Sequence, residues 1–185
     1  GDAMTGANPR RHVLITGASG AIGGALARAY AAPDVLLSLT GRDTTRLRQT
    51  AEQCRQRGAQ IASAELDVTD SARLMQWIEA RDHDQPIDLI IANAGMTSTL
   101  GPRDGVESWE RIQQVFQVNL IGALACVQPL ITRMAQRGCG QIGLMSSLGA
   151  YVGMPVSPTY NASKAAILIY GAGLRGRLSP RGVGV

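Results

Sequence analysis

One tyrosine and one lysine in this sequence are spaced so that they could carry out proton transfer. Tyr160 and Lys164 lie four residues apart in the segment Tyr-Asn-Ala-Ser-Lys, and residues with this spacing share one face of a helix. An ammonium group beside a phenol favours the phenolate, which lowers the pKa of the tyrosine from about 10 and suits it to acid–base chemistry on a carbonyl or an alcohol. Lys164 is the only lysine among 18 basic residues, which indicates a task that arginine does not perform.

A glycine-rich segment near the N-terminus is spaced for binding phosphate groups. Gly17 and Gly20 lie between a short apolar run, residues 12–16, and a helical pattern, residues 22–30, and Gly23 lies in the first turn of that pattern. In this context the first glycine permits a tight turn, the second lets a pyrophosphate approach the backbone, and the third allows close packing of helix on strand. The helix N-terminus then presents unpaired N–H groups to the phosphates. The residues predicted to line this dinucleotide site are Gly17, Ser19, Gly20, Ile22 and Gly23.

The end of the second apolar run predicts which dinucleotide is preferred. This run, residues 34–40, is followed by Gly41 and Arg42, where a carboxylate would bind the adenosine ribose and disfavour a 2′-phosphate. Gly41 leaves space there, and Arg42 can bind that phosphate through a bidentate, charge-assisted contact. The pair predicts NADP(H), with NAD(H) as the alternative if Arg42 is a solvated turn residue.

Alternating strand and helix patterns would bring these residues together. Short apolar runs indicate strands, and the longer stretches of helical period between them indicate helices. The predicted strands are residues 12–16, 34–40, 60–66, 87–92, 141–145 and 182–185, and the predicted helices are residues 22–30, 44–57, 71–80, 106–137 and 158–178. This alternation predicts a Rossmann-type, doubly wound parallel sheet in a three-layer α/β/α arrangement. We expect one such domain over residues 11–185, after a flexible N-terminal segment, residues 1–10.

Five landmarks in order resemble the short-chain dehydrogenase/reductase family. They are the loop 16–23, Asp67 with Val68, Asn93 with Ala94 and Gly95, Asn119, and Ser147 with Tyr160 and Lys164. The resemblance extends from Arg11 to Val185, and the joint order of the landmarks is far more specific than any one of them. It implies an oxidoreductase that transfers a hydride between a nicotinamide and a small-molecule ketone or secondary alcohol.

The resemblance also implies the catalytic roles. Ser147 would hydrogen-bond the substrate oxygen and stabilise charge as it develops, while Tyr160 handles the proton. Lys164 would lower the pKa of Tyr160 and hold the nicotinamide ribose, so that Tyr160 and Lys164 belong to the cofactor site as well. Asn119 would interrupt the long helix and anchor a water that relays protons to Lys164, whereas the alternative is an asparagine that faces solvent or satisfies a backbone kink. Tyr151, Met154 and Pro155 would edge the substrate pocket.

At the adenosine end, the resemblance implies contacts from two strand ends. Asp67 would accept a hydrogen bond from the adenine amino group and the Val68 amide would contact the base, although Asp67 could instead lie only at a helix cap. Ala94 and Gly95 are small and would let the adenine ribose lie close to the backbone. Asn93 would mainly bridge two strands.

Several features leave the activity open. Ala21 stands where the common family loop has glycine, and Gly20 stands where NADP enzymes often have a basic residue. The Pro-Gly turn, the substrate loop and the seventh strand of the family do not follow Val185, so we expect the sequence to be C-terminally incomplete. A sugar-nucleotide epimerase or dehydratase and a non-catalytic dinucleotide-binding protein are the alternatives.

Composition excludes other classes of protein. A content of 45% hydrophobic residues excludes disorder, and a net charge of +4 with only 4% aromatic residues argues against nucleic-acid binding. No uninterrupted apolar stretch approaches about 20 residues, so no membrane span is expected. The three cysteines form no CxxC pair and the two histidines lie far apart, so we predict no metal site and a cytoplasmic location. The resemblance implies a homodimer or homotetramer through the fourth and fifth helices.

Overall fold

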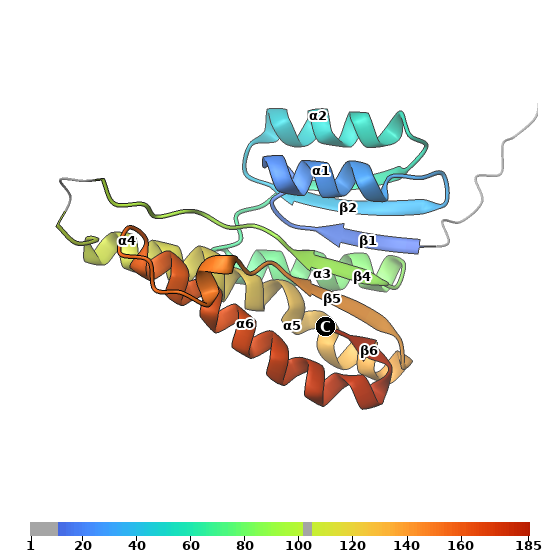
Figure 1. The fold of residues 1–185 in the computed structure, drawn as a ribbon. Coiled ribbons are helices and arrows are strands. Elements are labelled where there is room, and N and C mark those ends of the chain that lie inside the picture. The colour runs from blue at the N-terminus through green and yellow to red at the C-terminus, as the bar shows by residue number, and fades with distance from the viewer. Residues whose placement is uncertain (1–10, 102–104) are drawn as a thin grey trace, which may run out of the picture.

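The computed structural model describes residues 11–101 and 105–185, and within them six parallel strands form one sheet (Figure 1). The strands are β1 (Arg11–Ile15), β2 (Val35–Gly41), β3 (Gln60–Glu65), β4 (Leu89–Ala92), β5 (Gly140–Leu144) and β6 (Val183–Gly184). Their order across the sheet is β3-β2-β1-β4-β5-β6. The order reverses between β1 and β4, and ligands of such sheets bind beyond the carboxyl ends of the strands at that point. The predicted flexible segment, residues 1–10, lies outside the described residues.

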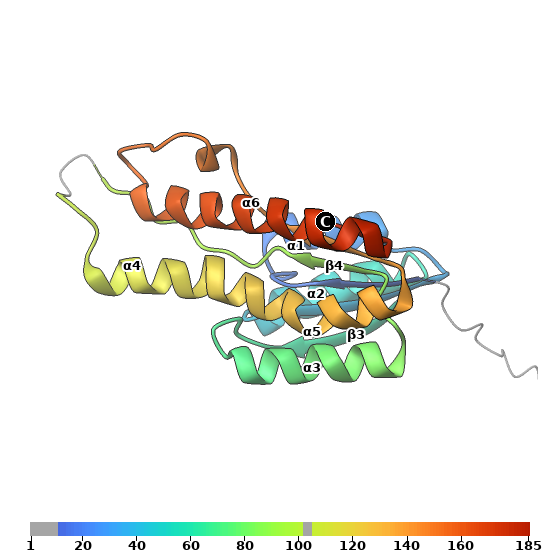
Figure 2. The same ribbon diagram turned by 90° about the horizontal axis from the view of Figure 1, so that it is seen from below.

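Helices cover both faces of this sheet. They are α1 (Ala21–Tyr30), α2 (Thr44–Arg55), α3 (Ser71–Asp84), α4 (Trp109–Phe116), α5 (Gly122–Arg137) and α6 (Pro158–Leu178), with a π-helical turn, η1 (Gln117–Ile121), between α4 and α5 and two short 3₁₀ turns, η2 (Leu148–Ala150) and η3 (Ser179–Arg181). Figure 1 shows α1 and α2 above β1 and β2, and Figure 2 shows α3, α5 and α6 side by side. Buried residues of α1 and α2 pack in one core cluster and those of α3, α5 and α6 in another, so the two groups of helices cover opposite faces. The predicted Rossmann-type α/β/α fold is therefore confirmed.

The ends of the helices differ from the predicted ones where local hydrogen bonds decide them. The long helix predicted for residues 106–137 begins at Trp109, because the Ser108 hydroxyl accepts from the Arg111 backbone N–H at 3.2 Å and caps the helix. The helix predicted for residues 71–80 continues to Asp84. The turn η2 was not predicted, since three residues are too short to show a period.

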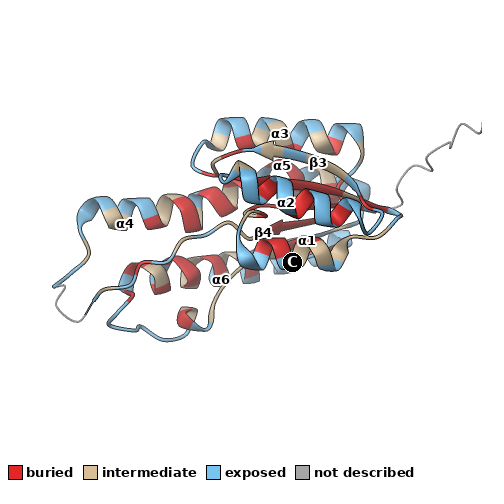
Figure 3. Cartoon of the chain, turned by 90° about the horizontal axis from the view of Figure 1, so that it is seen from above, coloured by how far each residue is buried: buried red, intermediate tan, exposed pale blue. Residues whose placement is uncertain are grey.

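Side-chain alternation along the strands divides the core into two parts. On β1, Val13 and Ile15 pack with the residues of α1 and α2, whereas Leu14 packs with the residues of α3, α5 and α6, because successive side chains of a strand point to opposite faces. Figure 3 shows the buried residues on the strands and on the sides of the helices that face them. Both faces of β1 are thus anchored, which holds the loop that follows it in place.

The helical run Trp109–Arg137 has the length and composition of a membrane-crossing helix, with a mean hydropathy of 1.6 in its most apolar window. The prediction of no membrane span relied on uninterrupted apolar stretches and did not anticipate this run. In the fold, 56% of that window is buried, and α5 packs against α3, β4 and β5. This burial accounts for its apolar composition, since a helix that covers a core can be as long and as apolar as one that crosses a membrane.

Candidate active site

A cavity of about 360 Å³ opens at the carboxyl ends of β1, β2 and β4, where the strand order reverses. Its lining residues come from the glycine-rich loop, the ends of β2 and β4, and the segment after β3; they are Gly17, Ser19, Gly20, Ala21, Ile22, Gly23, Gly41, Arg42, Leu66, Asp67, Val68, Asn93, Ala94, Gly95 and Val118. The predicted cofactor residues therefore all line this cavity except Tyr160 and Lys164. The sequence prediction missed three of its residues, namely Ala21, Leu66 and Val118, and gave Gly41 only the role of leaving space.

The glycine-rich loop has the shape of a cradle that larger side chains would fill. Gly17 has a φ of +69°, and a Cβ on it would lie 2.8 Å from the Ala94 Cα. A Cβ on Gly23 would overlap the carbonyl oxygen of Gly17, so that glycine allows the close packing of α1. Gly20 is the N-cap of α1 and has no side chain that could cap the helix. The first N–H groups of the helix are therefore available to an anion. The loop fits the pyrophosphate of a dinucleotide.

Asn93 connects the end of β4 to this loop. Its Nδ2 donates hydrogen bonds to the carbonyl oxygens of Thr16, at 3.0 Å, and of Gly17, at 3.4 Å. Its backbone N–H donates to the Thr16 hydroxyl at 3.2 Å. The side chain thus holds two strand ends together, as the expected bridge between strands would.

Arg42 and Asp67 occupy the β2–β3 side of the cavity. Partial burial by itself would raise the pKa of Asp67, but two hydrogen bonds from Thr69 and the charge of Arg42 outweigh it and lower that pKa below its ordinary value. The sequence prediction assumed that Gly41 leaves open space for the phosphate, and this assumption is wrong. A Cβ there would lie 2.8 Å from the Ser19 Cβ, because Ser19 from the glycine-rich loop already fills that position.

Tyr160 and Lys164 project from α6 into one volume. The Lys164 Nζ lies 5.9 Å from the centroid of the Tyr160 ring and donates a hydrogen bond to the carbonyl oxygen of Met145 at 2.8 Å. Only 5% of Lys164 is exposed, and this burial lowers its pKa. The predicted juxtaposition of phenol and ammonium is present, with the ammonium largely shielded from water.

Gly95 links this pair to the cavity. It lines the cavity, and a Cβ on it would lie 3.5 Å from the Lys164 Nζ and 3.4 Å from the Asn119 Oδ1. These are ordinary van der Waals distances, so the backbone at Gly95 lies directly beside Lys164 and Asn119. One lining residue of the dinucleotide cavity, Gly95, therefore lies next to Lys164 of α6.

Ser147 lies between β5 and α6, at the N-cap of η2. Its Oγ accepts a hydrogen bond from the Gly149 backbone N–H at 3.2 Å, and this bond does not use the hydroxyl proton of Ser147. The neighbouring Ser146 donates its hydroxyl proton to the Lys164 carbonyl oxygen at 2.9 Å. These contacts attach the end of β5 to α6 close to Lys164.

Asn119 lies in the π-helical turn η1, so the predicted interruption of the long helix is present. Its Oδ1 accepts from the Met96 N–H at 2.8 Å, and its Nδ2 donates to the Met96 carbonyl at 3.0 Å and to the Ser163 hydroxyl at 3.1 Å. Both amide protons are thus used by protein groups of the segment after β4 and of α6, and not by solvent or by the backbone of the interrupted helix. The predicted water relay stays a prediction, and Asn119 would have to hold that water with other atoms than Nδ2.

A polar cluster around Glu107 was missed by the sequence prediction. The Glu107 carboxylate accepts hydrogen bonds from the hydroxyls of Ser98 and Thr159 and from the Thr159 backbone N–H. Thr159 is 52 residues from Glu107 in the sequence. No local spacing relates these residues, so only their positions in the fold reveal the contact.

Three comparisons with known proteins agree on the kind of chain this is. The family model described as short chain dehydrogenase matches residues 11–185. An uncharacterised oxidoreductase of Mycobacterium tuberculosis is 36% identical over 180 residues, which cover 95% of this chain and 70% of that protein. A short-chain dehydrogenase from Sphingobium yanoikuyae, solved in complex with NADPH, has a TM-score of 0.84 at 31% identity and covers 94% of this chain and 67% of its own. The structure of NAD⁺-bound xylitol dehydrogenase has a TM-score of 0.86 at 25% identity, and the match covers 95% of this chain and 67% of that one.

Proposed function

The chain belongs to the short-chain dehydrogenase family and is a nicotinamide-dependent oxidoreductase; from this premise we propose that it interconverts ketones and secondary alcohols, with Tyr160 as the proton donor and acceptor. The observation that carries the proposal is the position of the buried Lys164 ammonium, 5.9 Å from the centre of the Tyr160 ring. Gly95, which lines the dinucleotide cavity, lies beside Lys164. The bound dinucleotide would supply or accept the hydride.

The residues around the cavity support NADP(H) as that dinucleotide. Gly17 and Gly23 leave room for a pyrophosphate, and the uncapped N-terminus of α1 offers N–H groups to it. Arg42 carries a positive charge at the end of β2, and 64% of its side chain is exposed, so it is accessible to a 2′-phosphate. Asp67 and Val68 line the same side and would contact the adenine. NAD(H) remains the alternative, since related structures contain either dinucleotide.

The catalytic groups have complementary proton-transfer roles in this proposal. In reduction, the hydroxyl of Tyr160 donates its proton to the carbonyl oxygen, and the resulting phenolate is stabilised by the Lys164 ammonium. The Ser147 hydroxyl donates a hydrogen bond to the same oxygen and keeps its proton, and this bond stabilises the negative charge that develops there. In oxidation, the phenolate of Tyr160 accepts the proton from the alcohol.

The side chains expected to edge the substrate pocket bear on the character of the substrate. Tyr151 and Met154 lie in the segment between Ser147 and Tyr160, with 72% and 40% of their surfaces exposed. They support a substrate with a hydrophobic part. We also propose a homodimer or homotetramer through the α4–α5 run and α6, and three exposed apolar side chains on these helices, Trp109, Ile121 and Ile169, support it.

The proposal is tested by following NADPH absorbance with a panel of ketones and by replacing single tyrosines in the full-length protein. Tyr160→Phe removes only the hydroxyl, so we expect turnover to be abolished and NADPH binding to be retained. Tyr170→Phe, which removes a phenol from the same helix, is the matched control and should leave turnover close to that of the wild type. Turnover that persists in Tyr160→Phe would contradict the assignment.

A further inference from the structure

The N-terminus of α6, which carries Tyr160, is capped by a residue that is distant in the sequence. Ser157 is the N-cap of α6 but makes no side-chain capping bond, and Pro158 follows it and has no N–H to donate. The backbone N–H of Thr159 donates instead to Oε2 of Glu107 at 3.1 Å, and the Thr159 hydroxyl donates to the same oxygen. Glu107 thus supplies the negative capping group that helix N-termini favour.

The other oxygen of Glu107 is bound to the segment that follows β4. Its Oε1 accepts from the hydroxyl of Ser98. Arg111, near the start of α4, donates from Nη2 to the Thr97 carbonyl at 2.6 Å and from Nε to the Ser98 Oγ at 3.4 Å. Ser98 and Thr159 are nearly fully buried, with 3% and 6% of their surfaces exposed. One carboxylate therefore joins the segment after β4 to the first turn of α6.

The charge of Glu107 suits this arrangement. Burial by itself would raise its pKa, but the hydrogen bonds from Ser98 and Thr159 and the charge of Arg111 outweigh burial and lower the pKa below its ordinary value. The side chain is therefore a carboxylate at neutral pH. An ionised acceptor makes stronger hydrogen bonds to hydroxyl and amide donors than a neutral one.

The two segments that Glu107 joins carry the two halves of the site. The segment after β4 begins with Asn93 to Gly95, which line the dinucleotide cavity, and α6 carries Tyr160 one residue after Thr159. We propose that Glu107 is a positioning residue, which fixes Tyr160 relative to the cavity by holding the first turn of α6 against the segment after β4. This inference rests on the proposed function, because it assigns Glu107 an effect on the chemistry of Tyr160.

A second connection holds α6 farther along and makes the contribution of Glu107 separable. Asn119 bonds to Ser163, and the Ser163 hydroxyl donates to the Tyr160 carbonyl at 2.7 Å. This connection remains when Glu107 is replaced, so we expect α6 to stay attached while its first turn gains freedom. A misplacement of about 1 Å in a reacting group can reduce the rate by about 100-fold.

The test replaces Glu107 in the full-length protein and separates turnover from binding. Glu107→Ala should lower kcat by about 10- to 100-fold. The KM for the ketone and the Kd for NADPH should change by less than about three-fold, because Glu107 does not line the cavity and is not assigned a contact with the reacting atoms. Glu107→Gln keeps one carbonyl oxygen for the Thr159 N–H and should restore part of the lost kcat. Glu110→Ala, which removes the same charge from an exposed position of α4, is the matched control and should keep the wild-type kcat.

A double-mutant cycle identifies the contact through which Glu107 acts. Thr159→Val removes one of the hydroxyls that donate to the carboxylate, and we expect a smaller loss of kcat than in Glu107→Ala. The double variant should lose no more than Glu107→Ala alone, because both changes remove the same connection. If Glu107→Ala does not fold, Glu107→Gln and Thr159→Val are measured by the same split between kcat and KM.

The outcomes distinguish the two proposals. A folded Glu107→Ala or Glu107→Gln protein with wild-type kcat and a lower Tm would overturn the inference, since the carboxylate would then only stabilise the fold. Losses that add in the double variant would also overturn it. Failure of the proposed function appears earlier and differently, as turnover that survives Tyr160→Phe or is absent from the wild-type protein.

Discussion

Arg42 and Asp67 form an ion pair on the β2–β3 side of the cavity, with 3.8 Å between Nη1 and Oδ2. Their side chains are 64% and 41% exposed, and pairs with this exposure contribute little to stability. The guanidinium is therefore held near the cavity without being committed to the carboxylate. A phosphate that enters the cavity can take Asp67's place, because guanidinium groups bind phosphates in a bidentate manner.

The first prediction concerns selectivity between the two dinucleotides. Arg42→Ala should weaken NADPH binding by about 10- to 100-fold, since hydrogen bonds to charged groups contribute about 1.5–3 kcal/mol, and it should leave NADH binding nearly unchanged. Fluorescence titration of both dinucleotides measures the ratio. Arg46→Ala, an exposed arginine of α2 paired with Asp43, controls for the loss of charge. An unchanged ratio in Arg42→Ala contradicts the preference for NADP(H).

The second prediction concerns the phosphate cradle. Gly23→Ala should lower the free energy of unfolding by about 1–3 kcal/mol, as overpacking does, and weaken dinucleotide binding, because the added Cβ overlaps the Gly17 carbonyl. Urea denaturation and NADPH titration measure the two effects. Gly173→Ala on α6 is the control, since its Cβ would meet nothing within 4 Å, and it should raise stability by about 0.4–1 kcal/mol. Wild-type binding in Gly23→Ala would mean that the loop is only a turn.

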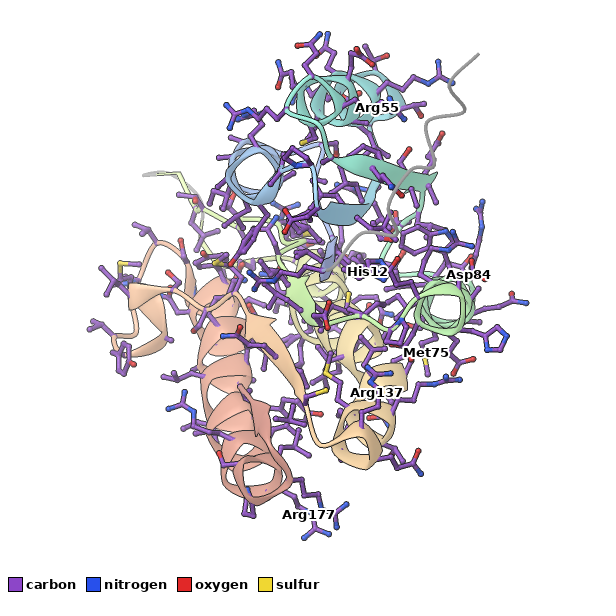
Figure 4. All side chains as sticks on the ribbon, turned by 90° about the vertical axis from the view of Figure 1, so that its right-hand side faces the viewer. His12, Arg55, Met75, Asp84, Arg137 and Arg177 are labelled. Carbon is purple, nitrogen blue, oxygen red and sulfur yellow. The ribbon has the colours of Figure 1, made fainter. Side chains whose placement is uncertain are left out.

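The third prediction concerns a histidine in the core at the amino-end side of the sheet. Figure 4 shows His12 in the interior, and its ring nitrogens lie 2.8 Å from the Gln85 carbonyl oxygen and 2.8 Å from the Ser38 Oγ. Burial lowers the pKa of His12 below 6.5, although the hydrogen bond to Gln85 and the charge of Asp88 oppose this. The neutral ring therefore suits the folded protein better than the imidazolium.

It follows that acid destabilises the protein through His12. Below the unfolded pKa of about 6.5 the unfolded chain binds a proton that the folded protein does not, so the free energy of unfolding should fall as the pH decreases from 6.5 toward the folded pKa, and stay constant above 6.5 as far as His12 is concerned. Urea denaturation between about pH 5.5 and 8 measures this slope. His12→Asn should flatten it, whereas His83→Asn on the surface of α3 should not. An unchanged slope in His12→Asn would assign the dependence to other groups.

The fourth prediction concerns the reactivity of the cysteines. Burial raises the pKa of the Cys126 thiol to about 12, despite a hydrogen bond to Thr16 that opposes the shift, and burial also raises the pKa of Cys54. Cys139 is exposed. Because the thiolate is the reactive form, a thiol-reactive dye at neutral pH should label Cys139 in the folded protein and reach Cys54 and Cys126 only after denaturation. Mass spectrometry locates the label, and rapid labelling of Cys126 in folded protein would contradict its placement.

Local spacing in the sequence determined most of the elements and part of the site. Tyr160 and Lys164 share a helix face because the helix repeats every 3.6 residues, and that relationship holds wherever the helix is placed. The glycine spacing likewise determines a turn followed by a helix, and the observed φ of Gly17 and close packing at Gly23 agree with it. The alternation of strand and helix was enough to predict the order of layers, since connections between parallel strands are right-handed.

Only the tertiary structure decided which distant side chains meet. Ser19 fills the space beside Gly41, Asn119 gives its amide protons to Met96 and Ser163, and Glu107 caps a helix 52 residues away. None of these contacts has a sequence period, because each depends on how two separately formed elements pack. The same holds for the apolar run Trp109–Arg137, whose burial depends on the sheet beneath it. Spacing along one helix thus determined the Tyr160–Lys164 pair, whereas packing between elements determined what surrounds it.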